Sequence, residues 1–134
     1  MRKILFVLLL VVSLALSACG AAKPTTTINV TLTDFQFQPA DFIIPAGQEI
    51  TVNAANNGAV VHNFVIMKSG TTVGDMFDDD DKPNVYWEVE LAPGGDTSVT
   101  FTAPTEPGEY QLVCRTAGHI ASGMTGSITV VAGE

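Results

Sequence analysis

The feature that most limits how this chain can fold is a series of short runs in which apolar and polar residues alternate. Turn-forming Gly, Pro, Asn and Asp residues interrupt these runs, and beyond residue 28 no segment keeps a helical period. Such a pattern is typical of an all-β sandwich or barrel. We expect about eight strands, at residues 28–33, 42–44, 49–53, 60–67, 85–91, 97–102, 109–114 and 127–131.

Two of the expected strands carry a polar residue on a face that is otherwise apolar. Alternate residues of a strand point to the same side of a sheet, so each set shares one surface. His62 and Cys114 are therefore expected to point into the interior of the sandwich. The two sets are Val60, His62, Phe64 and Ile66 in one strand and Tyr110, Leu112 and Cys114 in the other.

The charge of the chain excludes one class of partner. Fourteen acidic residues outnumber six basic ones, giving a formal net charge of −8. Nucleic acid is unsuitable as a partner because its phosphates select for Lys and Arg, whereas a basic protein would be attracted.

The longest gap between expected strands, residues 68–84, is expected as a loop with room for one short helix, and it contains Asp78-Asp79-Asp80-Asp81. We interpret this run as a solvated, charged loop rather than a docking or cation site.

The N-terminus has the order of a secretory signal. Two basic residues precede an apolar run at residues 4–16, which is shorter than the roughly 20 residues that cross a bilayer. Leu16-Ser17-Ala18-Cys19 resembles the lipobox of bacterial lipoproteins. This resemblance implies a signal peptide at 1–18, a lipid on Cys19, a flexible tether at 19–27 and a folded domain at 28–134. The expected location is extracytoplasmic, lipid-anchored to a bacterial membrane on its periplasmic side or at the cell surface.

The use of cysteine points to a metal. The chain has two cysteines, and acylation of Cys19 would make its sulfur unavailable for a disulfide. Cys114 would then be a solitary thiol in an oxidising compartment, where an unprotected thiol is a liability. Binding of its thiolate to a metal ion would protect it.

The segment at residues 114–124 spaces Cys114, His119 and Met124 five residues apart, directly after an expected strand. A loop that folds back brings three such residues to one point, and two glycines in the segment supply the backbone freedom. His62 would join them from a different strand. One thiolate, two imidazoles and a weak axial thioether are the ligands of electron-transfer copper. Structural zinc usually has four strong ligands, so we predict one type 1 copper site.

The chain resembles the cupredoxins over residues 28–131. The resemblance rests on Val61-His62-Asn63-Phe64, on Pro107-Gly108-Glu109-Tyr110, and on the spacing Cys-x4-His-x4-Met, which is similar to that of the auracyanins. It departs at Ala117, where family members commonly have proline before the Gly-His pair. The family implies a Greek-key β-sandwich, with Asn63 helping to hold the cysteine loop. It also implies that His119 reaches the surface as the electron port.

These expectations combine into a function. We expect a monomeric, membrane-tethered carrier that moves single electrons between redox proteins, such as cytochromes or membrane electron-transfer complexes, without enzymatic chemistry. Met124 would tune the reduction potential. A small apolar docking patch around His119 would comprise Ala59, Val60, Ile120 and Ala121. The alternatives are an extracytoplasmic copper-delivery or copper-storage protein and a metal-free sandwich for adhesion or assembly.

Overall fold

A computed structural model describes residues 22–133, which contain nine strands and one 3-10 turn, η1 (Lys82–Asn84). The all-β prediction is confirmed. The predicted signal peptide and Cys19 lie outside the described residues. The strands are β1 (Thr27–Thr33), β2 (Gln36–Gln38), β3 (Asp41–Pro45), β4 (Glu49–Asn56), β5 (His62–Met67), β6 (Val85–Leu91), β7 (Asp96–Thr102), β8 (Gly108–Val113) and β9 (Thr125–Val131).

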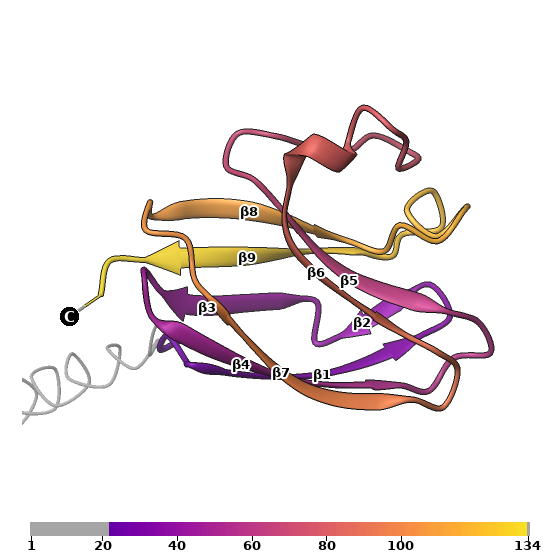
Figure 1. The fold of residues 1–134 in the computed structure, drawn as a ribbon, viewed down its shortest axis with the longest axis horizontal. Coiled ribbons are helices and arrows are strands. Elements are labelled where there is room, and N and C mark those ends of the chain that lie inside the picture. The colour runs from indigo at the N-terminus through magenta and orange to yellow at the C-terminus, as the bar shows by residue number, and fades with distance from the viewer. Residues whose placement is uncertain (1–21, 134) are drawn as a thin grey trace, which may run out of the picture.

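The strands form two sheets that face each other across the core (Figure 1). One sheet has the order β2-β1-β4-β7 and the other has the order β3-β9-β8-β5-β6. The pairs β1–β4 and β3–β9 are parallel, and the remaining pairs are antiparallel. This crossing of the chain between two sheets places β5 and β8, which are far apart in the sequence, side by side.

The core between the sheets is centred on an aromatic cluster. Phe64 on β5 is fully buried, and its ring lies 5.8 Å from that of Phe37 and 6.0 Å from that of Phe42. Trp87 contributes from β6, with its ring 6.4 Å from Phe64. Edge-on and tilted contacts of this kind are the preferred geometries of aromatic pairs. The cluster therefore fixes β5 against both sheets.

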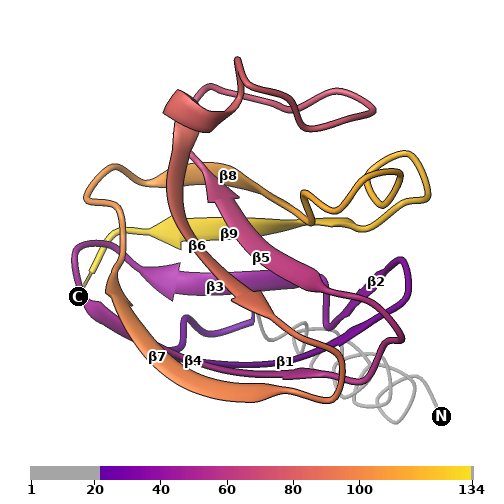
Figure 2. The ribbon, with the colours of Figure 1, turned by 45° about the vertical axis from the view of Figure 1, so that its right-hand side comes forward.

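All six residues of β5 are buried, so this strand has no solvent-facing side. Alternate residues pack into the main core, while Val65 and Met67 join a second apolar cluster with Val73 and Val113. The segment at residues 68–84, expected as a loop with one short helix, contributes Val73 to this cluster and includes η1. It lies over the sheet near β5 and β8 (Figure 2).

Most strands begin or end one to three residues beyond or short of the expected ranges, and two differences affect which residues are exposed or paired, at the start of β5 and at β2. β5 begins at His62, and Val60, expected in the core, has 43% of its surface exposed because it lies in the turn before the strand. β2 was not expected, since Gln36-Phe37-Gln38 is short and is followed by Pro39. It pairs with β1 through a two-residue turn, Asp34-Phe35, because Thr33 lies opposite Gln36.

The folded part begins slightly before the predicted residue 28. The Thr25 N–H donates to the Ile43 carbonyl at 2.9 Å, and the Thr51 N–H donates to the Thr26 carbonyl at 2.9 Å. The predicted boundary therefore falls inside β1.

None of the helical segments among residues 22–133 has the length and apolar character needed to cross a bilayer.

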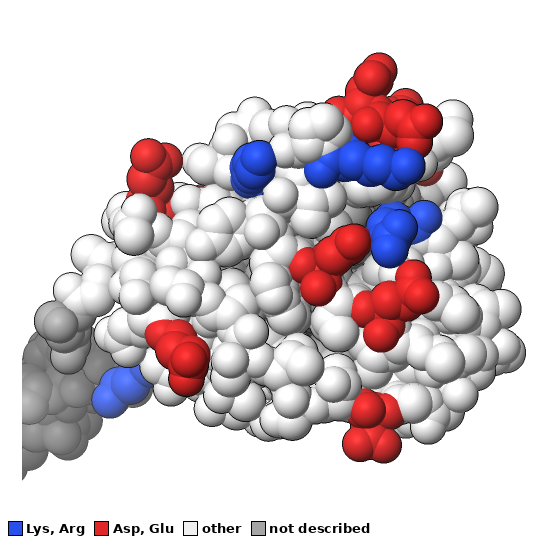
Figure 3. Space-filling model, viewed as in Figure 1, with Lys and Arg blue, Asp and Glu red and all other residues white. Residues whose placement is uncertain are grey.

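The acidic run at residues 78–81 lies on the surface within the segment at 68–84. Figure 3 shows acidic side chains gathered over this segment, beside basic ones. Asp79 Oδ1 lies 2.6 Å from Lys82 Nζ, and the hydrogen bond from Lys82, together with its positive charge, lowers the pKa of the Asp79 carboxyl. The Asp78 and Asp80 backbone N–H groups donate to carboxylates of the run at 2.9 Å. These local contacts are those of an exposed, charged turn.

Candidate metal centre

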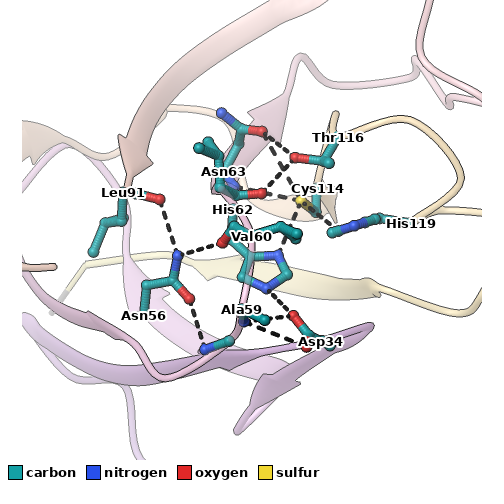
Figure 4. A network of polar contacts seen from close by, with 12 residues as sticks. Asp34, Asn56, Ala59, Val60, His62, Asn63, Leu91, Cys114, Thr116 and His119 are labelled. Carbon is teal, nitrogen blue, oxygen red and sulfur yellow. Dashed lines mark hydrogen bonds and ion pairs between the residues drawn. The ribbon is translucent and has the colours of Figure 1, made fainter. Parts of the chain in front are cut away.

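Three potential metal ligands meet at one end of the sandwich. His62 is the first residue of β5, Cys114 directly follows β8, and His119 lies in the loop between β8 and β9. Cys114 Sγ lies 3.8 Å from His62 Nδ1 and 3.4 Å from His119 Nδ1. The candidate donor atoms all lie within 4.8 Å of one another, close enough to share one ion (Figure 4).

The loop at residues 114–124 closes on itself through backbone hydrogen bonds. The Met124 N–H donates to the His119 carbonyl at 2.9 Å, and the Cys114 N–H donates to the Met124 carbonyl at 3.2 Å. Gly118 and Gly123 have φ angles of 81° and 94°, a region that other residues rarely adopt. A folded loop, and not a helix, thus brings Cys114, His119 and Met124 together.

The four candidate ligands are shielded from solvent. His62, Cys114 and Met124 are fully buried, and His119 is 5% exposed. Burial lowers the pKa of His119 below its usual value, and charge on His62 acts in the same direction, whereas the carboxylate of Asp34 opposes it. The lowered pKa favours the neutral imidazole, which is the form that binds a metal.

Asn63, the residue expected to hold the cysteine loop, contacts the thiol directly. Its backbone N–H donates to Cys114 Sγ at 3.4 Å. Its side-chain Oδ1 lies 3.2 Å from the Thr116 hydroxyl, which also lies 2.8 Å from the Val61 carbonyl oxygen. Its amide Nδ2 donates to Glu90 Oε2 at 2.9 Å. Asn63 therefore links β5 to the start of the loop and places an N–H dipole at the sulfur.

A carboxylate that sequence reasoning missed lies on the other side of His62. Asp34 Oδ1 is 3.2 Å from His62 Nε2. The Ala59 backbone N–H lies 3.1 and 3.3 Å from the two oxygens of the same carboxylate. An aspartate in a turn is too common for the sequence to single it out, and its partner is 28 residues away.

Asn56 organises the turn that leads to His62. Its side-chain Nδ2 donates to the carbonyls of Val60 and Leu91 at 2.9 and 3.0 Å. Its Oδ1 accepts from the Gly58 N–H at 2.8 Å. This buried amide therefore fixes the residues just before β5, a role that an Asn in a turn signal does not reveal by itself.

The surface around His119 is apolar, but its composition differs from the expected patch. Phe35, 47% exposed, meets the His119 ring edge-on with a centroid distance of 5.2 Å. Val60 and Val61 are 43% and 38% exposed. Ile120, expected in the patch, is instead half-buried because it packs against the second apolar cluster. We call Phe35, Val60 and Val61 the apolar rim.

The donor set fits copper. Two imidazoles, one thiol and one thioether converge in a buried space, whereas Mg²⁺ and Ca²⁺ prefer oxygen ligands. Sulfur ligands suit Cu(I), imidazole accommodates copper in both oxidation states, and a long axial methionine is characteristic of electron-transfer copper. His62, Cys114, His119 and Met124 are arranged as a type 1 copper site, which makes this chain a blue copper protein by class.

A family model for the cupredoxin-like domain matches residues 6–130, and the chain belongs to the cupredoxin family. Auracyanin-A of Chloroflexus aurantiacus, a "blue" copper protein, is 30% identical over 115 residues, covering 75% of this chain and 70% of that protein. The copper-resistant cuproprotein CopI of Rubrivivax gelatinosus is 26% identical over 115 residues, covering 82% and 69%. Dithionite-reduced auracyanin of Roseiflexus castenholzii has a TM-score of 0.68 at 32% identity, covering 81% of this chain and 99% of that chain.

Proposed function

We propose that this chain is a membrane-tethered carrier that moves single electrons between extracytoplasmic redox proteins. Bound copper supplies the redox chemistry by alternating between Cu(II) and Cu(I). The observation that carries the proposal is a complete two-imidazole, two-sulfur donor set buried at the end of a rigid sandwich. Such a site suits electron exchange rather than substrate turnover, so we propose a carrier and not an enzyme.

The residues of the chain perform three tasks in this proposal. β5 and the 114–124 loop hold the ligands in place, which limits rearrangement when an electron arrives or leaves. The Asn63 N–H stabilises the negative charge of the Cys114 sulfur. The ring of His119 lies nearest to solvent among the four ligands and is bordered by Phe35, so it is the proposed port for electrons.

The direct test uses the copper-loaded protein, residues 20–134. We expect an intense visible absorption band in the oxidised form, bleached by one electron equivalent per chain and restored on reoxidation. Rapid exchange with a small basic cytochrome, measured by stopped flow, is the expected accompanying result. A band that does not bleach reversibly would contradict the carrier function.

An added charge on the apolar rim is expected to slow electron exchange. In Val60→Lys, the new ammonium group would repel a basic partner docked at His119 and would have to be desolvated against it, so the second-order rate should fall by about tenfold or more. The reduction potential should stay within about 30 mV, which is half of the shift of about 59 mV that a tenfold change in an equilibrium constant gives for one electron. Thr100→Lys, which adds the same charge on the exposed surface of β7, is the control. Equal rates for the two variants would exclude this docking surface.

Met124 is the proposed weak axial ligand. Met124→Gln replaces a soft thioether by a harder amide oxygen, which favours Cu(II) over Cu(I). We expect the ratio of Cu(II) to Cu(I) affinity to rise at least about tenfold, which corresponds to a fall of about 59 mV in reduction potential. Met76→Gln, at an exposed methionine, should leave the potential unchanged. A potential that also stays unchanged in Met124→Gln would remove Met124 from the ligand set.

Tethering through Cys19 is a separate part of the proposal, supported by the lipobox-like sequence. Mass spectrometry of the chain exported from a bacterial host checks it. The expected mature protein begins at Cys19, carries acyl chains and partitions into detergent. A soluble product cleaved elsewhere would contradict the anchor while leaving the copper function intact.

The similarity to a copper-resistant cuproprotein supports a second candidate, copper delivery or storage. The burial of the donor set weighs against it, because a delivery site must release its ion to an acceptor. Transfer of Cu(I) to a competing chelator distinguishes the two functions. Release within seconds together with slow electron exchange would favour delivery, and retention with fast exchange would favour the carrier.

A further inference from the structure

Asp34 contacts the side of His62 that faces away from the metal centre. His62 Nδ1 lies 3.8 Å from Cys114 Sγ, so this nitrogen faces the other donors. His62 Nε2 points in the other direction and lies 3.2 Å from Asp34 Oδ1 (Figure 4). The His62 side chain is fully buried, whereas that of Asp34 is 44% exposed. The carboxylate therefore joins a buried imidazole to the protein surface.

The position of the Asp34 carboxylate is built into the fold. The Ala59 backbone N–H donates to it at 3.1 Å, and Asn56 fixes the turn that contains Ala59. Gly58 packs directly against the pair: a Cβ on this residue would overlap His62 Nε2 and lie 2.6 Å from Asp34 Oδ1. The absence of a side chain at this position allows the backbone to approach closely and confine the contact.

The turn formed by Asp34 and Phe35 also contacts the second histidine. Asp34 is followed by Phe35, which has a φ angle of 69° and presents its ring edge to His119. The pairing of Thr33 with Gln36 holds this two-residue turn between the end of β1 and the start of β2. A turn that adopts a backbone conformation unusual for phenylalanine and touches both imidazoles is a candidate functional element.

We propose that Asp34 is a positioning residue that lowers the reduction potential of the copper site through His62. The inference rests on the proposed function, in which His62 Nδ1 is a copper ligand. A carboxylate that accepts a hydrogen bond from the distal N–H of a ligating histidine fixes its tautomer and raises its basicity. Its negative charge also stabilises a doubly charged ion more than a singly charged one. Both effects favour Cu(II).

The test is the reduction potential of Asp34→Asn, measured on the copper-loaded protein together with its visible spectrum. Asparagine keeps the size and one acceptor oxygen but removes the charge. We expect the absorption band to be retained and the ratio of Cu(II) to Cu(I) affinity to fall at least about tenfold, a rise of about 59 mV in potential. Asp34→Glu, which keeps the charge, should stay within about threefold of the wild type, or about 28 mV.

Glu49→Gln is the control for net charge. Glu49 begins β4, whose other end, Asn56, lies next to the site, so its charge is removed at the far end of the sandwich. Salt screens charges over that separation, so the potential should not move. An unchanged potential in Asp34→Asn, or a shift equal to that of Glu49→Gln, would overturn the inference. Loss of the band in Asp34→Asn would also overturn it, because Asp34 would then be required for assembly. Absence of the band in the wild type would instead refute the proposed copper function.

Discussion

Replacing Cys114 by serine is expected to abolish the visible absorption of the copper-loaded protein. The intense band of a blue copper site requires a thiolate bonded to copper, and Cys114 Sγ is the atom that lies near both imidazoles. Serine fits the buried space but offers an oxygen whose proton is not lost at neutral pH. The loss should therefore be complete, measured as absorbance per chain at saturating Cu(II).

The matched control is Cys19→Ser in the full chain, which makes the same chemical change outside the proposed site. It should keep the band at full intensity. Metal content, measured on both variants, separates a colourless copper complex from a chain without metal. A band that persists in Cys114→Ser would refute the thiolate assignment and with it the type 1 site.

Truncation of Phe64 should produce the largest loss of stability. Phe64→Ala removes a fully buried ring that contacts Phe37, Phe42 and Trp87, and it leaves a cavity in the core. We expect the free energy of unfolding of the copper-free protein to fall by about 3–5 kcal/mol. Urea unfolding followed by fluorescence measures it, and the copper-free form avoids added stability from the bound ion.

Thr100→Ala, at an exposed position of β7, is the control and should change the free energy of unfolding by less than about 0.5 kcal/mol. His62 and Asn63 directly precede Phe64 on β5, so the core variant should also weaken copper retention. A loss of stability below about 1 kcal/mol, small for a core truncation, would show that the aromatic cluster does not hold β5 in place.

The metal site was predictable because few side chains bind copper and this chain has few of them. Both histidines and Cys114, the cysteine not assigned to a lipid, fall at ligand positions, and the five-residue spacing favoured a loop. Asp34 and Phe35 were not predictable by the same reasoning. Their role comes from two turns that approach each other in space, which alternation along one strand does not reveal.

The strands were predictable where alternation continued over several residues. β2 was missed because three residues before a proline give too little pattern, and its pairing is set by the turn at Asp34-Phe35. Alternation places Val60 on the core face with His62, although the turn held by Asn56 leaves it exposed. The burial of Val73 under the 68–84 segment also depends on tertiary packing.

The direction of β1 has a consequence for the anchored protein. β1 runs from Thr27 to Thr33 and ends at Asp34, beside the metal centre, so the N-terminal attachment point lies at the opposite end of the sandwich. Seven residues of strand span about 23 Å, and the residues from Cys19 to the first backbone bond at Thr25 reach at most about 20 Å. In the proposed lipid-anchored form, the copper end would face away from the bilayer, at a height limited by the summed lengths of the tether and the strand. Soluble partners would meet it freely, whereas a partner embedded in the same membrane would need a domain that projects to that height.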